Sequence, residues 1–211
     1  MALSRLYFIT GETAPLEQVE GACRAGVRLI QLRMKEASDE EFLATAVEAM
    51  KICGGWGSRL IINDRAEVAV AVGADGVHVG NEDRPVREAR RILGEGKIVG
   101  GTANTLDDIR EHYRGGADYI GLGPYRYTTT KKKLSPTLGL EGYRGIMQQM
   151  EAEGMVVPVY AIGGIGVTDV RGLVEAGVYG VAFSGLLVRA GDWAEIVKEI
   201  LKQFSYVDYC G

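Results

Sequence analysis

The sequence contains few cysteines and few histidines. Its three cysteines are Cys23, Cys53 and Cys210, an odd number without any C-x-x-C spacing. This argues against a disulfide framework and favours the reducing conditions of a cytoplasm. The two histidines, His78 and His112, stand in no recognisable nucleophile arrangement with a serine or cysteine. A zinc site and a Ser-His-Asp triad are therefore disfavoured, and we expect both histidines to be structural.

The sequence also lacks the features of a membrane protein or a nucleic-acid-binding protein. No apolar run approaches the roughly 20 residues that cross a bilayer, and the first residues do not have the basic-then-apolar layout of a signal peptide. The formal net charge of -4 at pH 7 repels nucleic acid and acidic lipid at long range. We therefore expect a soluble, cytoplasmic protein in which anions bind only at local clusters of charge.

Short apolar runs alternate with helix-like stretches along the whole chain. The runs are continuous rather than alternating in polarity, which is typical of parallel strands that are covered on both faces. They predict eight strands, at Leu6–Thr10, Leu29–Arg33, Leu60–Asp64, Gly76–Gly80, Ile98–Thr102, Tyr119–Gly123, Pro158–Gly164 and Gly180–Ser184.

Helix signals lie between the predicted strands. Ser38 with Glu41 has the spacing of a capping box. Thr105 with Asp108 resembles one, and Asp192 can cap the last helix. Four segments repeat one layout, in which a glycine ends a helix, two residues turn the chain and an apolar strand begins. The glycines of this repeat are Gly26, Gly73, Gly116 and Gly177.

Eight strands with helical crossovers in 211 residues predict an α/β fold, a compact (βα)8 TIM barrel that forms a single domain over residues 1–211. A doubly wound open sheet is the alternative, but no G-x-G-x-x-G follows the first strand. The connection from Pro124 to Val157 is the one long excursion, and long loops in compact domains are often functional.

Polar residues follow seven consecutive predicted strands, beginning with the second. In a (βα)8 barrel the chemistry lies at the carboxyl ends of the strands, so these residues form the candidate site. They are Gln31–Lys35, Asn63–Arg65, Gly80–Asp83, Thr102–Asn104, Thr128–Lys131, Gly163–Gly164 and Ser184–Gly185.

Gln31, Arg33 and Lys35 alternate along the segment after the second strand. On an extended backbone their side chains would point to one side, into the mouth of the barrel. Two cations and an amide in that position could clamp a diphosphate. A lone lysine or arginine more often belongs to a solvated cluster of surface salt bridges, but the strand-end position and the common facing favour an anion site here.

Asp64 and Asp83 are the candidate metal ligands. Mg²⁺ is typically held by one or two carboxylates, with substrate phosphate oxygens and water completing its shell. Either aspartate could instead cap a helix, because helical residues follow the first and a proline follows the second within two residues. Together, beside a cationic cluster, they favour the metal.

The pairs Gly163-Gly164 and Ser184-Gly185 fall where barrel enzymes often bind phosphate, on the loops after strands seven and eight. Glycine lets backbone N–H groups approach phosphate oxygens closely. A glycine pair is weak support alone in a chain with 30 glycines, and it is the position of this pair that makes it a candidate.

Six motifs, in order, resemble those of the thiamine-phosphate synthase family. Each is weak alone, but their order and spacing match over residues 31–184. The motifs are Gln31-Leu32-Arg33-x-Lys35, Ile62-Asn63-Asp64-Arg65, Asp75-Gly76-Val77-His78-Val79-Gly80-x-Glu82-Asp83, Gly121-x-Gly123-Pro124, Thr128-x-Thr130-Lys131 and Ala161-Ile162-Gly163-Gly164-Ile165.

The resemblance implies a magnesium-dependent transferase. Such an enzyme condenses 4-amino-2-methyl-5-hydroxymethylpyrimidine diphosphate with 4-methyl-5-hydroxyethylthiazole phosphate, giving thiamine phosphate and diphosphate. By resemblance Asp64 and Asp83 hold Mg²⁺, and Arg33, Lys35 and Lys131 are catalytic. The pyrimidine diphosphate would bind Gln31, Arg33, Lys35, Asn63 and Lys131, and the thiazole phosphate would bind Thr128, Thr130, Gly164 and Ser184, with Gly163 and Gly185 beside them.

The chain departs from the family pattern in three places. Asn81 stands where glutamine is common, and Thr102-Ala103-Asn104 replaces a serine-and-histidine segment, although Thr102 can still offer a hydroxyl to the diphosphate. Extra residues follow Lys131, from Lys132 to Pro136.

Three other functions remain open from the sequence. A thiazole tautomerase would share the fold and the phosphate site but would not need the full diphosphate and metal set. A non-catalytic regulator that binds phosphorylated metabolites would bind without turnover. A sugar-phosphate isomerase would need a clear acid–base pair at the strand ends. For the synthase the partners are its two small-molecule substrates, without nucleic acid or membrane, and a homo-oligomer stays open.

Overall fold

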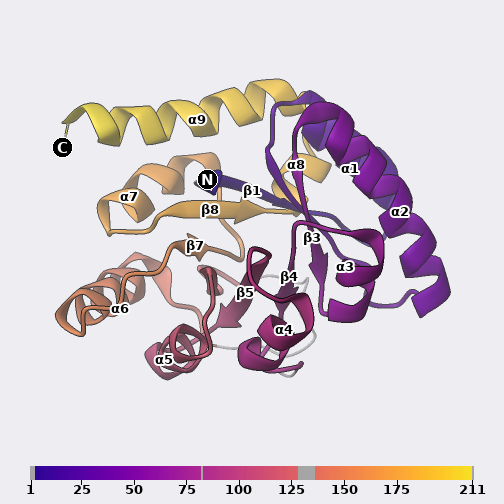
Figure 1. Ribbon diagram of the computed structural model, residues 1–211. Coiled ribbons are helices and arrows are strands. Elements are labelled where there is room, and N and C mark those ends of the chain that lie inside the picture. Colours follow the sequence, from indigo (N-terminus) through magenta and orange to yellow (C-terminus); the bar gives the residue numbers. More distant parts are fainter. Residues whose placement is uncertain (1–2, 82, 128–135, 211) are drawn as a thin grey trace.

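A computed structural model of the chain describes residues 3–81, 83–127 and 136–210, with side chains up to residue 205. Strands and helices alternate along the whole of it (Figure 1). In chain order the elements are β1 (Leu6–Ile9), α1 (Pro15–Arg24), β2 (Leu29–Leu32), α2 (Asp39–Trp56), β3 (Arg59–Asn63), α3 (Ala66–Val72), β4 (Gly76–Val79), α4 (Val86–Leu93), β5 (Ile98–Ala103), α5 (Leu106–Arg114), β6 (Tyr119–Leu122), α6 (Gly139–Ala152), β7 (Val159–Ala161), the 3₁₀ turn η1 (Val167–Asp169), α7 (Val170–Glu175), β8 (Gly180–Phe183), α8 (Gly185–Val188) and α9 (Trp193–Cys210).

The strands form a closed parallel barrel in sequence order, and β1 pairs with β8 to close it. Figure 1 shows the helices wrapped around the strands. The predicted (βα)8 barrel is therefore confirmed, and the open sheet is excluded. Strand β7 is shorter than predicted because Gly163 and Gly164, with φ of 87° and 71°, turn the chain out of the extended conformation.

The barrel has two apolar layers, separated by the strands. Along β1, Leu6 and Phe8 face outward and pack against the helices, whereas Tyr7 faces the interior. This alternation follows from the two-residue period of a strand. The interior layer contains Tyr7, Leu29, Ile61, Tyr119, Tyr160 and Ala182.

The predicted helix ends are also present. Gly26, Gly73, Gly116 and Gly177 all have positive φ, which allows the chain to leave each helix and enter the next strand. At the helix starts, Ser38 accepts a hydrogen bond from the backbone of Glu41, and Thr105 with Asp108 forms a complete capping box. Asp192 accepts from the backbone of Glu195, as expected for a cap of α9.

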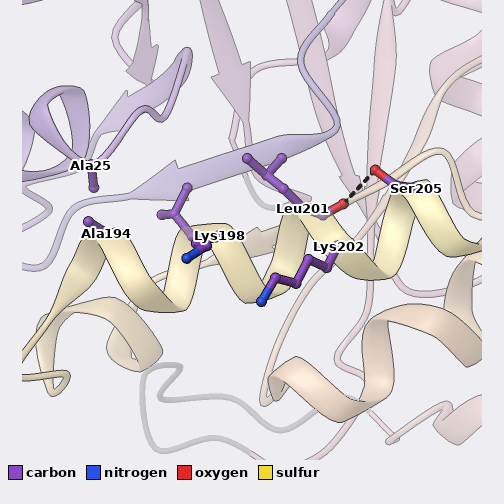
Figure 2. A pocket seen from close by; sticks show the side chains of 7 residues that line it. Ala25, Ala194, Lys198, Leu201, Lys202 and Ser205 are labelled. Atoms are coloured by element: carbon purple, nitrogen blue, oxygen red, sulfur yellow. Dashed lines mark hydrogen bonds between the residues drawn. The ribbon is translucent and has the colours of Figure 1, made fainter.

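An open groove of about 640 Å³ runs along α9 beside the end of α1 (Figure 2). It is lined by Ala25, Ala194, Val197, Lys198, Leu201, Lys202 and Ser205. None of these is a predicted site residue, and the groove belongs to the outer helical layer rather than to the strand ends. In the part of the chain that the structure describes, no helix is both long enough and apolar enough to cross a membrane.

Candidate active site

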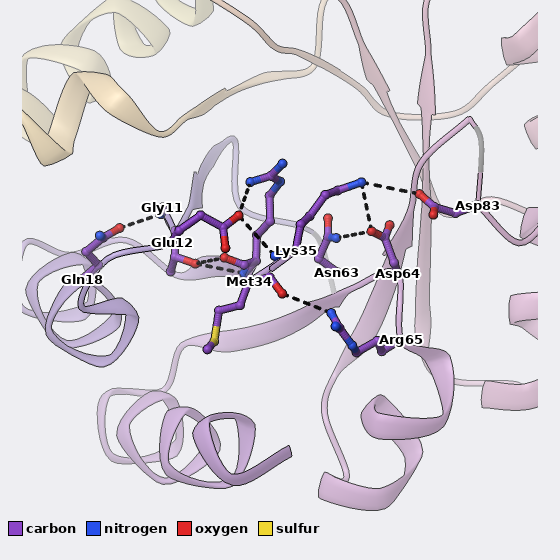
Figure 3. Close-up of polar contacts among 11 residues, drawn as sticks. Gly11, Glu12, Gln18, Met34, Lys35, Asn63, Asp64, Arg65 and Asp83 are labelled. Atoms are coloured by element: carbon purple, nitrogen blue, oxygen red, sulfur yellow. Dashed lines mark hydrogen bonds and ion pairs between the residues drawn. The ribbon is translucent and has the colours of Figure 1, made fainter. Parts of the chain in front are cut away.

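The mouth of the barrel contains two carboxylates with a lysine ammonium between them (Figure 3). Nζ of Lys35, from the segment after β2, lies 3.3 Å from Oδ2 of Asp64 and 3.9 Å from Oδ2 of Asp83. Asn63, the last residue of β3, donates from its amide to Oδ2 of Asp64. Four predicted site residues from three consecutive strand ends therefore form one cluster.

The backbone brings these side chains together. Asp64 adopts the left-handed conformation, with φ of 60°, directly after β3. The Arg65 guanidinium reaches across to the loop after β2, where it donates to the carbonyl of Met34 at 3.2 Å and to the carbonyl of Ala37 at 2.8 Å. This bridge fixes the segment that carries Lys35 beside Asp64.

The acidic pair fits a divalent cation. Burial raises the pKa of Asp83, and the neighbouring carboxylate of Asp64 raises it further, so the pair gains from a cation between its members. Gly80 leaves room for this arrangement, since a Cβ at that position would lie 2.4 Å from Oδ2 of Asp83. Among the described residues no third His, Cys, Asp or Glu side chain joins the pair. Two carboxylates with substrate oxygens and water match what Mg²⁺ accepts.

The side chain of Arg33 has a different partner from the side chain of Lys35. Its Nη1 donates to Oε1 of Glu12 at 2.9 Å, and the Arg33 side chain is 19% exposed. Gln31 is buried and extends into the barrel interior, where it donates to the hydroxyl of Tyr7. The side chains of these three alternating residues thus have different partners, because β2 ends at Leu32 and the chain beyond it is no longer a strand.

A chain of buried hydrogen bonds crosses the barrel interior from Gln31 to Thr102. Nε2 of Gln31 donates to Tyr7 at 2.7 Å, and the hydroxyls of Tyr7 and Tyr119 lie 2.8 Å apart. Nδ1 of His78 lies 3.0 Å from the Tyr119 hydroxyl, and its Nε2 lies 2.9 Å from Oγ1 of Thr102. Burial raises the pKa of both tyrosines, so both stay protonated at neutral pH.

Heavy-atom distances do not fix the proton positions along this hydrogen-bonded series, but they permit donors that run in one direction. Because Gln31 donates to Tyr7, the Tyr7 proton is available for Tyr119, and that of Tyr119 for Nδ1 of His78. A neutral His78 then carries its proton on Nε2 and donates it to Thr102. In that arrangement the hydrogen-bonded series offers a ligand two groups, the Oε1 acceptor of Gln31 at one end and the Thr102 hydroxyl proton at the other.

The loops after β7 and β8 are built differently from each other. Gly163 accepts from the backbone of Arg126 at 3.0 Å, and the Arg126 guanidinium holds Asp169, which also accepts from the backbone of Gly166 at 2.8 Å. These contacts fix the turn that contains Gly164. Ser184 directly precedes the short helix α8, which begins at Gly185. The predicted phosphate residues therefore lie at neighbouring strand ends. Thr128, Thr130 and Lys131 lie outside the described residues.

Sequence reasoning missed Glu12 and Tyr7, and it expected Tyr119 to belong to the core and His78 to be structural. Tyr7 on β1 and Tyr119 on β6 stand at positions that face the barrel interior, where side chains from different strands can join in one network, and this was the available signal. His112, by contrast, bonds to the scaffold, with its Nε2 2.7 Å from the backbone carbonyl of Thr102.

A closed (βα)8 barrel with charged groups gathered at its strand ends defines a barrel enzyme whose site suits anions and a divalent cation. Comparison with known proteins gives the family. The thiamine monophosphate synthase family matches residues 6–187. A thiamine-phosphate synthase from Bacteroides fragilis is 49% identical over 199 residues, which cover 93% of this chain and 98% of the relative. One from Flavobacterium johnsoniae is 42% identical over 88% of this chain and 87% of its own.

A solved structure agrees with these relatives. Thiamine phosphate pyrophosphorylase from Pyrococcus furiosus matches with a TM-score of 0.83 and 32% identity over 96% of each chain. The chain belongs to the thiamine monophosphate synthase family. The family resemblance of its motifs and the prediction of an enzyme of this kind are confirmed.

Proposed function

We propose that this protein condenses 4-amino-2-methyl-5-hydroxymethylpyrimidine diphosphate with 4-methyl-5-hydroxyethylthiazole phosphate, giving thiamine phosphate and diphosphate. The observation that carries the proposal is the cluster of Lys35, Asn63, Asp64 and Asp83, in which an ammonium lies 3.3 Å from one carboxylate and 3.9 Å from the other. Such a cluster can hold a cation and a polyanion side by side, as the departure of diphosphate requires.

The charged residues of the mouth would stabilise the leaving diphosphate. Arg33 and Lys35 supply fixed positive charge where negative charge grows, and Lys131 is proposed to join them as a third cation. Asp64 and Asp83 would hold Mg²⁺, which when bound offsets the charge on the departing diphosphate. Asn63 holds the Asp64 carboxylate in place through its amide.

The hydrogen-bonded chain from Gln31 to Thr102 would bind the aminopyrimidine. An exocyclic amino group needs an acceptor, which Oε1 of Gln31 offers, and a ring nitrogen or a diphosphate oxygen needs a donor, which the Thr102 hydroxyl offers. Because the intervening tyrosines and His78 are hydrogen-bonded in series, both ends are preorganised before the substrate arrives.

The second substrate would bind on the opposite strands. Its phosphate is proposed to rest against Gly163, Gly164, Ser184 and Gly185, with Thr128 and Thr130 on the same side. The turn at Gly164 is rigid because Arg126 and Asp169 hold it from both sides. In this proposal the thiazole ring lies over the barrel and faces the pyrimidine.

The reaction then exchanges one bond for another. The bond between the pyrimidine methylene carbon and the diphosphate oxygen breaks, with both electrons leaving on the oxygen. The electron-rich aminopyrimidine supports the positive charge on the methylene carbon, and the thiazole nitrogen donates its electron pair to form the new carbon–nitrogen bond. Little proton transfer is needed, which agrees with a site whose histidine is engaged in the interior.

The proposal is tested by a turnover assay on the purified protein with both substrates, with Mg²⁺ and with a chelator. We expect thiamine phosphate and diphosphate in equal amounts with Mg²⁺, and no product when either substrate is left out or the metal is chelated. Binding of the thiazole phosphate without any product, from protein that is folded, would refute the synthase and favour the tautomerase or the regulator.

A further inference from the structure

One carboxylate outside the predicted site contacts both Arg33 and Lys35, which together are called the cationic arm. Glu12 lies on the loop between β1 and α1, and its Oε1 accepts from Nη1 of Arg33 at 2.9 Å and from the backbone N–H of Lys35 at 3.2 Å. Figure 3 shows this carboxylate beside Lys35, with Asn63, Asp64 and Asp83 beyond. A single oxygen thus fixes the side chain of one cation and the backbone of the other.

The loop that carries Glu12 is itself anchored on both sides. Thr10 exchanges hydrogen bonds with the backbone of Arg33, accepting its N–H at 2.9 Å and donating to its carbonyl at 3.3 Å. Gln18, from α1, accepts the N–H of Gly11 at 2.8 Å and donates to the carbonyl of Thr13. Glu12 therefore has a fixed position relative to β2. Its contacts with Arg33 and Lys35 hold these two residues in a defined arrangement.

The presence of a carboxylate beside an anion site has to be explained, because its negative charge repels the ligand. The five N–H donors of a guanidinium provide one, since a single donor given to Glu12 leaves four for a diphosphate. The side chain of an arginine also has many rotamers, which an unfixed Arg33 would have to order at each binding event. Fixing the arm in advance removes that loss from the binding of the anion.

We propose that Glu12 is a positioning residue that holds Arg33 and Lys35 in the arrangement that receives the diphosphate. This inference rests on the proposed function, since it assigns Glu12 to the diphosphate clamp of that reaction. Glu12 does not touch the substrate, and it acts through the geometry of the two cations.

The test compares two variants of equal charge. Glu12→Gln keeps an acceptor oxygen at the same position and loses the negative charge, whereas Glu12→Ala loses both. Any effect of removing the charge is shared by the two, so their difference reports positioning alone. Glu20→Ala, which removes an exposed carboxylate of α1 paired with Arg24, is the matched control.

Calorimetric titration with inorganic diphosphate and Mg²⁺ should show that Glu12→Gln binds roughly 10-fold more tightly than Glu12→Ala. The kcat for thiamine phosphate should fall about 10-fold in Glu12→Ala, with a smaller change in KM, and be largely restored in Glu12→Gln. Equal diphosphate affinities and equal kcat values for the two folded variants would overturn the inference.

This experiment distinguishes a failure of the synthase proposal from a failure of the positioning role. If the wild-type protein makes no thiamine phosphate while Glu12→Gln still binds diphosphate more tightly than Glu12→Ala, the synthase proposal fails and the positioning role stands. If the wild type is active and the two variants behave alike, the synthase proposal stands and the positioning role fails. Thermal unfolding of each variant shows that the comparison is made on folded protein.

Discussion

The ammonium nitrogen of Lys35 lies 3.3 Å from Oδ2 of Asp64, in the space between the two carboxylates proposed to hold Mg²⁺. A lysine in this place acts as an internal counter-ion, and a divalent cation that binds the pair must displace it. The same ammonium, once displaced, is close to the place where the diphosphate of the substrate would bind.

Replacing Lys35 by methionine should therefore separate metal binding from catalysis. Mg²⁺ should bind Lys35→Met more tightly than the wild type in the absence of substrate, because the competing charge is gone and the repulsion between Asp64 and Asp83 is unrelieved. Turnover should fall by about 10²-fold, since a fixed cation at the leaving group is lost. Calorimetric titration with Mg²⁺ and the turnover assay measure the two effects. Weaker Mg²⁺ binding in the variant would show that Lys35 supports the metal rather than competing with it.

Removing the hydroxyl of Tyr119 should destabilise the barrel interior. Tyr119→Phe leaves the Tyr7 hydroxyl and Nδ1 of His78 without their shared partner, both of them buried. We expect a loss of about 2–3 kcal/mol in the free energy of unfolding, measured in urea. Tyr113→Phe on the exposed side of α5 is the control and should change little. A Tyr119→Phe protein as stable as the wild type would mean that the buried chain is not needed for stability.

The ring of Tyr119 leaves no space for a side chain at Gly100 on β5. A Cβ on Gly100 would lie 2.1 Å from Cζ of Tyr119, a side chain that is wholly buried. Gly100→Ala should therefore cost about 3 kcal/mol or more of unfolding free energy. Gly145→Ala, in the interior of α6 with no atom within 4 Å of the added carbon, should instead stabilise the protein by about 0.5–1 kcal/mol. Similar effects at the two positions would refute the tight fit of Tyr119 against β5.

The Arg126–Asp169 pair predicts the sign with which the free energy of unfolding depends on pH. Burial tends to raise the pKa of Asp169, but hydrogen bonds from Arg126 and from the backbone of Gly166 outweigh it and lower the pKa. A lowered folded-state pKa contributes stability above the unfolded pKa of about 4, and that stability is lost as the pH falls through the folded value. The contribution is about 1 kcal/mol or less because Arg126 is largely exposed.

Asp169→Asn should accordingly make the unfolding free energy less dependent on pH below about pH 4 and leave the slope near neutral pH unchanged. Urea unfolding at a series of pH values measures this. Asp107→Asn, whose carboxylate is exposed on α5, is the control. A steeper acid dependence in Asp169→Asn would contradict the assignment.

The sequence is enough to predict the scaffold, and local physics explains why. Gly26, Gly73, Gly116 and Gly177 mark helix ends by a conformation that glycine adopts without cost, and the structure has positive φ at all four. Continuous apolar runs mark the eight strands. The position of Asp64 after β3 likewise follows from the strand-end rule.

The contacts within the site could not be predicted in the same way. Glu12 is 21 positions from Arg33, and only the pairing of β1 with β2 brings them together. The path from Gln31 to Thr102 depends on which residues of five strands face inward and on the size of the tyrosines that fill the interior. Both features depend on how the strands pair in three dimensions, which no single strand determines.

The most direct test of the account is the rate of thiamine phosphate formation by the wild type and by Asp64→Asn, at saturating Mg²⁺ and both substrates. Asparagine tolerates the left-handed backbone of this position, with φ of 60°, so the variant should fold. The account predicts Mg²⁺-dependent product from the wild type and a rate lower by at least about 10²-fold in the variant. A wild type without product, or an Asp64→Asn protein as active as the wild type, would contradict it.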